Sequence, residues 1–127
     1  MHRSKLVAAV IDCQVEDLTA GARFWSAALG RGIKQSEAGD NPKYAVLGDG
    51  NEDLMLLLQQ VSHPSRVHLD IETDNIEAEV ARLEALGARR LEKVKTWWVM
   101  EAPTGHRFCV VRPQRDGKMP TDANEWP

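Results

Sequence analysis

The sequence predicts an α+β fold made of two tandem βαβββ modules. An amphipathic helical pattern occurs twice, from Asp17 to Gly30 and from Asp74 to Gly87, at an offset of 57 residues. Both patterns end in Ala-Leu-Gly, and each follows an apolar strand-like stretch and precedes three more short ones. Two copies with the same order of elements indicate an internal repeat.

At 127 residues the chain fits one domain that can bury an ordinary core. Apolar residues make up 43% and charged residues 28%, which is normal for a globular protein. The net charge of −3 gives no attraction to nucleic acid or to anionic membranes, and no apolar run is long enough to span a bilayer. We expect a single domain, with module one at about 5–60, module two at about 66–112 and a tail at 113–127.

The stretch from Arg66 to Glu72 carries the clearest strand signal. Apolar and polar residues alternate, which is typical of a strand that is buried on one face only. The apolar set, Val67, Leu69 and Ile71, is expected to face the helices. The polar set, His68, Asp70 and Glu72, is expected on the opposite face.

The second helix is expected to begin at Asp74, whose carboxylate can cap the first turn, with Glu77 in a capping-box position. Its apolar stripe comprises Ile76, Val80, Leu83 and Leu86. Its solvated face comprises Glu77, Glu79, Arg82 and Glu84. Gly87 ends it, because glycine readily takes the left-handed conformation.

The first module repeats this pattern with weaker signals. Leu6 to Ile11 is expected as a strand and Asp17 as the next cap, and Gly30 closes the helix. The apolar stripe of that helix is Leu18, Ala22, Trp25 and Leu29.

Turn residues divide the rest of each module into three short strands. The expected strands are Ile33–Ser36, Tyr44–Leu47, Leu54–Gln59, Arg89–Val94, Trp97–Glu101 and Arg107–Val111, with a turn at 39–42 among those between them. The tail after Pro113 shows no periodicity, and Trp126 is expected to pin it to a neighbouring surface.

The duplicated βαβββ unit, with His68 opening its second half, resembles the vicinal oxygen chelate superfamily of glyoxalases, bleomycin-resistance proteins and extradiol dioxygenases. It is most similar to the small glyoxalase-like domain proteins. The resemblance is carried by Asp12-Cys13, Phe24-Trp25, Ala28-Leu29-Gly30, Val67 to Ile71, Leu86-Gly87-Ala88, Trp98-Val99-Met100 and Pro103 to Val111. The last of these looks like the DPxGNxFCxx ending of the group.

The resemblance implies that each module is a curved four-stranded sheet with its helix on the convex side, and that the two sheets form a cup. A cup lined by a few polar groups among apolar ones is typical of a small-molecule site. The residues expected to line it and bind a ligand are His68, Asp70, Tyr44, Trp97 and Gln59. Trp98, the neighbour of Trp97, is expected to face outward, because consecutive strand residues point to opposite faces.

Metal-dependent members of the superfamily use ligands from the first, fourth, fifth and eighth strands. His68 matches the fifth-strand ligand, but the first-strand position falls on Val10 or Ile11, which cannot coordinate a metal ion. The fourth strand offers only Gln59, and the eighth-strand position falls near Cys109. A catalytic metal ion needs about three protein ligands, so we predict that the usual site is absent and that His68 is a ligand if any residue is.

A second ligand set remains open. The His68-x-Asp70 pair supplies two donors of the kind found in 2-His-1-carboxylate iron centres, with His106 or His63 as a third. The simpler interpretation of His68 is a neutral imidazole that is hydrogen-bonded to a neighbour and available for ligand binding or proton transfer.

Asp12 and Asp70 are candidates for a general base, although a turn-capping carboxylate at a strand end is the favoured interpretation of both. Arg107 is either an anion-binding group or a surface residue. Cys109, on an apolar strand, is expected to be a small buried hydrophobe.

Three functional hypotheses follow, of which one is an interaction domain whose cup is vestigial and binds neither a metal ion nor a small ligand. The other two concern the cup itself. The first is a protein that binds a small molecule without a metal ion or other cofactor. The second is a metal-dependent lyase, isomerase or dioxygenase that uses His68 as a ligand. No nucleic-acid or membrane partner is expected. The resemblance favours a homodimer, and the two cysteines without a CxxC pair favour a reducing, cytoplasmic location.

Overall fold

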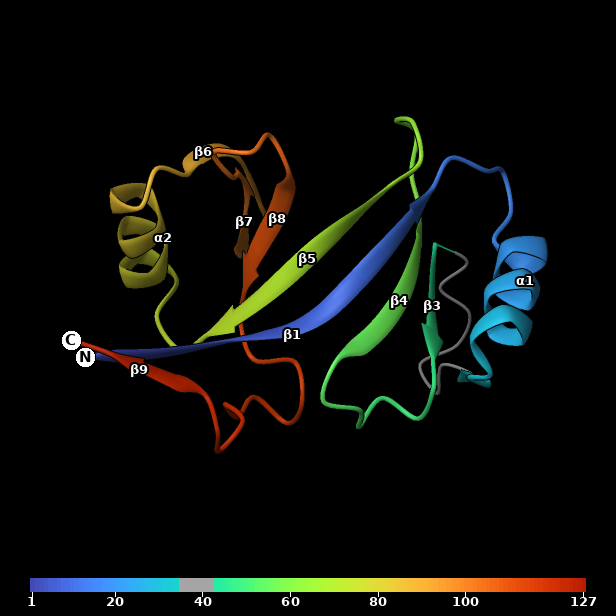
Figure 1. Ribbon diagram of the computed structural model, residues 1–127, viewed down its shortest axis with the longest axis horizontal. Coiled ribbons are helices and arrows are strands. Elements are labelled where there is room, and N and C mark those ends of the chain that lie inside the picture. The colour runs from blue at the N-terminus through green and yellow to red at the C-terminus, as the bar shows by residue number, and fades with distance from the viewer. Residues whose placement is uncertain (35–42) are drawn as a thin grey trace. The chain divides into compact units, whose positions relative to one another are not determined.

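A computed structural model describes residues 1–34 and 43–127 of the chain, and its ribbon is drawn in Figure 1. The fold is α+β, as predicted, and its element order is two βαβββ runs followed by one further strand. The helices are α1 (Thr19–Leu29) and α2 (Ile76–Ala85). The strands among the described residues are β1 (His2–Cys13), β2 (Ile33–Lys34), β3 (Tyr44–Leu47), β4 (Met55–Gln60), β5 (Arg66–Thr73), β6 (Arg89–Val94), β7 (Trp97–Glu101), β8 (Arg107–Val111) and β9 (Asn124–Trp126). Neither described helix is long and apolar enough to cross a membrane.

The chain forms two compact units, whose boundary falls inside the two longest strands. The 8–68 unit is one continuous segment, whereas the terminal unit combines residues 1–7 with residues 69–127. Strands β1 and β5 therefore each contribute to both units.

In the 8–68 unit the strand order is β2-β3-β4-β1, with β1 and β4 parallel and the other pairs antiparallel. One sheet face packs against α1 and buries Leu47 and Leu58 completely. Leu18 and Ala22 cover them from the helix side, and Trp25 packs at the margin. Burial of these side chains stabilises the unit by roughly 1.5–3 kcal/mol for each large one.

In the terminal unit the order from β5 is β5-β8-β7-β6, with β5 and β8 parallel and the others antiparallel. Helix α2 packs on this sheet, and the core consists of Val80, Met100, Phe108 and Val110. The start of β1 lies beside the end of β5, where the Asp74 amide donates to the Arg3 carbonyl.

Most predicted elements are confirmed, because their signals are local. The bounds of β3, β6, β7 and β8 agree with the expected ones, and β5 extends the expected strand by one residue. Both closing glycines have positive φ, +70° at Gly30 and +109° at Gly87. Of the strand expected at Ile33–Ser36, the structure has β2 at Ile33–Lys34; residues 35 and 36 and the expected turn at 39–42 lie outside the described residues.

The expected helix caps need correction. The N-cap of α2 is Asn75, whose side chain accepts a hydrogen bond from the Ala78 amide, and not Asp74. The Asp74 carboxylate instead accepts from the Arg3 amide at 2.9 Å, so it ties the helix to β1. The N-cap position of α1 is Leu18, while Asp17 accepts a hydrogen bond from the Thr19 amide.

Four apolar residues expected in the core are exposed. Leu29 and Leu86 are 45% and 67% exposed; Leu29 is the last residue of α1, and Leu86 follows the last residue of α2. Val67 and Leu69 are 57% and 44% exposed. Only Ile71 of the apolar set on β5 packs against the core of the terminal unit.

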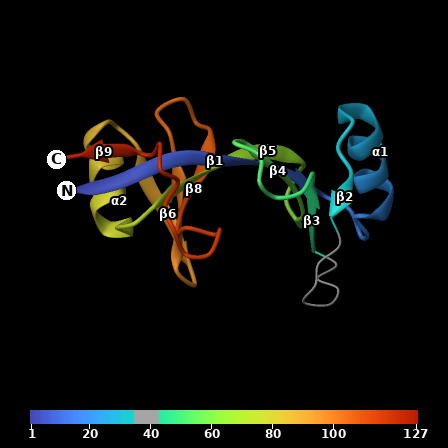
Figure 2. The same cartoon turned by 90° about the horizontal axis from the view of Figure 1, so that it is seen from below.

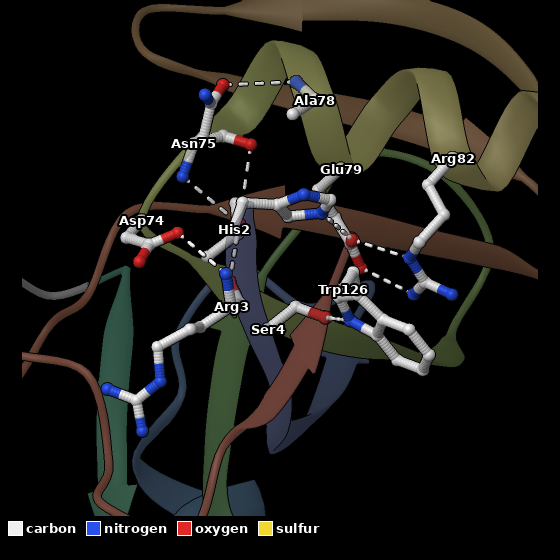
Figure 3. A network of polar contacts seen from close by, with 10 residues as sticks. His2, Arg3, Ser4, Asp74, Asn75, Ala78, Glu79, Arg82 and Trp126 are labelled. Carbon is white, nitrogen blue, oxygen red and sulfur yellow. Dashed lines mark hydrogen bonds and ion pairs between the residues drawn. The ribbon is translucent and has the colours of Figure 1, made fainter.

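Glu79 was expected on the solvated face of α2 and is instead completely buried. Its carboxylate lies 2.8 Å from His2 Nε2 and accepts two hydrogen bonds from the Arg82 guanidinium, each 2.8 Å long. Burial acts to raise the pKa of Glu79, but the hydrogen bonds from Arg82, His2 and Ser4 outweigh it and hold the pKa below its ordinary value. Figure 3 shows this network between the start of β1, α2 and the C-terminal strand.

The tail forms a strand that the sequence did not indicate. β9 pairs antiparallel with the start of β1, with His2 opposite Trp126, and Figure 2 shows the two side by side. The expected contact of Trp126 is present: its indole N–H donates to Ser4 Oγ at 2.8 Å, and the Arg82 guanidinium lies 3.9 Å from its ring centroid.

Candidate functional site

A hydrogen-bonded pair of Asp12 and His68 is the main polar feature of the 8–68 unit. Asp12 lies near the end of β1 and His68 on β5, and Asp12 Oδ2 is 2.7 Å from His68 Nδ1. The Asp12 side chain is 3% exposed and that of His68 is 13% exposed. Neither is a surface group, so the pair requires a structural or functional reason.

The contact with Asp12 favours one tautomer of the imidazole. An ionised carboxylate only accepts hydrogen bonds, so Nδ1 of His68 donates to Asp12. In the neutral ring Nε2 then carries the lone pair. A histidine held in this way can accept a proton, donate one after protonation, or coordinate a metal ion.

Two of the predicted ligand-binding residues lie in the same row as Asp12. Asp12 is in register with Gln59 on β4, and Gln59 is in register with Tyr44 on β3. The Gln59 amide donates to the Tyr44 hydroxyl at 3.1 Å. Side chains in register on neighbouring strands share a sheet face.

This row lies on the face turned away from α1. The adjacent row, Ile11, Leu58 and Ala45, packs with the core under α1, and neighbouring strand residues point to opposite faces. By the same alternation, Val10, Leu57 and Val46 share the face of the polar row. The 8–68 unit thus presents polar groups beside apolar side chains on one sheet face, a combination typical of small-molecule sites.

Asp70 and Cys109 form a second pair, in the terminal unit. They are in register across β5 and β8, and the Asp70 carboxylate lies within 4.8 Å of Cys109 Sγ. Cys109 is a free thiol that is 8% exposed, so it is buried as expected. Ile71 and Val110, one residue further along each strand, pack with the core under α2, so Asp70 and Cys109 point away from that helix.

Trp97 and Trp98 follow the predicted alternation. Trp98 packs against the core under α2, with the Arg90 guanidinium 5.1 Å from its ring centroid. Trp97 precedes it on β7 and so points to the other face.

Glu72, the third polar residue of the β5 face, is 2% exposed. Burial raises the pKa of its carboxyl group, although one oxygen accepts a hydrogen bond from the Gln114 amide at 3.2 Å. Such a group is a structural carboxyl whose charge costs free energy.

The usual metal-ligand set of the superfamily does not fit this chain. The first-strand position offers Val10, which is buried and apolar, or Ile11, which packs in the core under α1. At the fourth-strand position the Gln59 amide is bonded to Tyr44. The donors present are instead Asp70 with Cys109, and His68 two residues before Asp70 on the same strand.

The other histidines named as ligands have local partners. His106 Nδ1 lies 2.7 Å from Thr104 Oγ1 in an exposed turn, and His63 Nδ1 lies 2.8 Å from the Pro64 carbonyl oxygen. Arg107 is exposed at the start of β8. Asp12 and His68 are both candidates from the sequence, but no local pattern connects them, because they are 56 residues apart. One signal pointed to Asp12: a carboxylate at the end of a strand that is otherwise largely apolar.

Several solved structures share this fold. Methylmalonyl-CoA epimerase from Mycobacterium tuberculosis matches 87% of this chain and 89% of its own, at 16% identity and a TM-score of 0.60. A Streptomyces coelicolor methylmalonyl-CoA epimerase matches 86% of this chain and 98% of its own, at 16% identity and a TM-score of 0.53. A variant of homoprotocatechuate 2,3-dioxygenase from B. fuscum matches 86% of this chain but 32% of its own, at 19% identity and a TM-score of 0.51. At these identities the likeness concerns the fold.

A comparison with curated protein sequences gives no match. The sequence profile of the family described as "Glyoxalase-like domain" matches residues 8–111. That match covers both βαβββ runs from the middle of β1 to the end of β8. The chain therefore belongs to the glyoxalase-like domain family.

Proposed function

We propose that this protein binds a small oxygen-bearing organic molecule at His68 and exchanges a proton with it, without a divalent metal ion. The observation that carries the proposal is the 2.7 Å contact between Asp12 and His68. A buried carboxylate that orients an imidazole is the arrangement used for general acid–base chemistry. The polar row of Gln59 and Tyr44 supplies further hydrogen-bonding groups on the face that carries Asp12.

The ligand class follows from the chemistry of these groups. An imidazole and an amide or phenol recognise carbonyl, hydroxyl or carboxylate oxygens, and the apolar neighbours Val10, Leu57 and Val46 favour a carbon skeleton. The fold likeness to methylmalonyl-CoA epimerases makes carbonyl compounds, including acyl-CoA thioesters, the first ligands to screen.

The test is a ligand-observed NMR screen of carbonyl compounds, followed by the same measurement in heavy water. With the wild-type protein, we expect a bound compound to exchange a hydrogen next to its carbonyl for deuterium. In the His68→Gln variant, we expect the NMR signal of binding to be lost. Asp12→Asn is expected to keep binding and to slow the exchange, because the ring loses its fixed tautomer. His106→Gln, which changes an exposed histidine, is the matched control. Binding that is indifferent to His68 contradicts the proposal.

A second candidate is a metal-dependent enzyme, which is favoured by the approach of Asp70 to Cys109. In this candidate His68 is one ligand, as the resemblance implies, and Asp70, two residues later on the same strand, is a second. Asp12 orients the His68 ring, as carboxylates do for metal-bound histidines. A bound divalent ion supplies Lewis-acid chemistry.

A thermal-shift titration of chelator-stripped protein with nickel, zinc, manganese, cobalt and ferrous iron separates the candidates. The second predicts saturable stabilisation by one ion that is lost in both His68→Ala and Asp70→Asn. The first predicts no response to any of the five.

A further inference from the structure

A cleft of 530 Å³ opens in the terminal unit, apart from the residues considered above. Three elements form it: the start of α2, the turn between β6 and β7, and the segment that follows β8. Its lining residues are Thr73, Asp74, Asn75, Ile76, Glu77, Lys93, Lys95, Thr96, Trp98, Arg112, Pro113 and Gly117. A volume of this size accommodates a small organic ligand.

The acidic residues that line the cleft have hydrogen-bond or ion-pair partners among the described residues, whereas the cations have no ion pair there. Lys93, Lys95 and Arg112 form no ion pair with any residue in the described parts of the chain. The two acidic lining residues have partners: Glu77 pairs with Arg90 at 3.3 Å, and Asp74 accepts from the Arg3 amide. All three side chains are exposed, and they outnumber the two acidic residues that line the cleft.

The start of α2 adds to this positive field. The first backbone N–H groups of a helix and its dipole favour an anion. Asn75 caps one of these groups, the Ala78 amide.

Trp98 contributes a polar atom without a partner. Its indole nitrogen is buried and has no hydrogen-bond acceptor among the described residues. A buried N–H without an acceptor costs roughly 1–3 kcal/mol, and such groups persist mainly where a ligand or water completes them.

The turn that carries Lys95 is in an unfavourable conformation. Lys95 and Thr96 form a two-residue connection between β6 and β7, and Lys95 has φ of +52°. Asn or Gly normally occupies this position, because a larger side chain is strained there. The strained backbone belongs to one of the three cations at the cleft, and backbone strain of this kind gathers at functional sites.

We propose that this cleft binds the phosphoryl group of a small organic phosphate. A phosphate monoester carries up to two negative charges and several acceptor oxygens, which Arg112 and the two lysines can engage together. The cleft is larger than inorganic phosphate needs, so the organic part of the ligand occupies the remainder, next to the Trp98 ring. The site contains neither His68 nor Asp12, so it stands or falls independently of the function proposed above.

The test is an NMR titration of the whole chain with phenyl phosphate, inorganic phosphate and citrate. We expect saturable shifts at the Trp98 indole N–H and at the amides of Lys95, Thr96 and Ile76, strongest for phenyl phosphate. Replacing each cation by glutamine should weaken binding about tenfold, the effect of losing one charge-assisted hydrogen bond. The triple variant Lys93→Gln/Lys95→Gln/Arg112→Gln should abolish it.

A triple variant with the same change of net charge is the control. Arg23→Gln, Lys34→Gln and Arg107→Gln remove three exposed cations that do not line the cleft. Binding retained in this variant and lost in the other supports the site. Equal loss in both, citrate binding as tightly as phenyl phosphate, or no saturable response overturns the proposal. Binding retained in His68→Gln shows that the phosphate site and the His68 site are separate.

Discussion

The two βαβββ modules share a backbone plan but bury different chemistry under their helices. With the repeat offset of 57 residues, Ala22 of α1 corresponds to Glu79 of α2. Both are buried, at 5% and 0% exposure. Ala22 packs in a cluster with Leu18 and Leu58, whereas Glu79 forms ion pairs with His2 and Arg82. The comparison shows that a repeat can copy the elements and their order while the character of a buried position changes with what packs beside it.

Placing the buried carboxylate of the second module at the matching position of the first should have the largest effect on stability. Ala22→Glu places a carboxylate in a core cluster made of apolar side chains. We expect a loss of about 4 kcal/mol or more in the free energy of unfolding, because the charge has no cationic partner there. Urea unfolding measures the loss. Arg23→Glu, an exposed neighbour on the same helix, should change the stability little. Equal stability of Ala22→Glu and the wild type would show that the first module tolerates the chemistry of the second.

Removing the buried carboxylate from the second module should lower the free energy of unfolding by a smaller but still large amount. Glu79→Ala leaves His2 buried and Arg82 half-buried without their acceptor, and we expect a loss of about 3 kcal/mol. Glu77→Ala, an exposed residue two positions earlier, is the control and should change stability by about 0.5 kcal/mol or less.

The lowered pKa of Glu79 also predicts how stability changes with pH. The pKa of Glu79 is lowered on folding, so its contribution is present above its ordinary value of 4.5 and is lost as pH falls through the folded pKa. The acid-induced loss of stability should therefore be smaller in Glu79→Gln than in the wild type. An unchanged acid profile in that variant would contradict the assigned role.

The C-terminal strand completes the second module, and Trp126 is its main contact. Trp126→Ala removes the hydrogen bond to Ser4 and the stacking on Arg82, so we expect a loss of about 2 kcal/mol. Glu125→Ala on the same strand changes a side chain that is 67% exposed, and it should have little effect. If the two variants unfold at the same urea concentration, β9 does not stabilise the module.

Replacing Glu72 should have the smallest effect on stability, and the effect should be opposite in direction to that of replacing Glu79. Burial raises the pKa of Glu72 on folding, so its ionised form costs stability as pH rises through the folded pKa, above 4.5. Glu72→Gln should be more stable than the wild type at neutral pH by about 1 kcal/mol, and the difference should vanish in acid. Unfolding curves at several pH values measure it. A neutral variant that is less stable at pH 7 would refute the sign.

The sequence predicted the elements because their signals are local. Alternation along Arg66–Glu72, helical spacing on both helices and the glycines at 30 and 87 each depend on residues within a few positions of one another. These features agree with the structure, apart from shifts of a residue or two at some ends.

What the sequence analysis missed depends on contacts between distant segments. Glu79 has the spacing of a solvated residue, but it is buried and its carboxylate contacts His2, which is 77 positions away in the sequence. The Asp12–His68 contact joins residues 56 positions apart. Periodicity identifies the face on which a side chain lies but not the partner that comes to cover it.

The split of β1 between the two units implies an order in which the units fold during synthesis on the ribosome. The 8–68 unit is a continuous segment and can close while the rest of the chain is still being translated. The terminal unit cannot, because residues 2–4 pair with residues 124–126, which are made more than a hundred residues later. Residues 2–4 therefore remain unpaired along that edge until β9 has left the exit tunnel. During that interval the start of β1 is an open strand edge of the kind that chaperones protect.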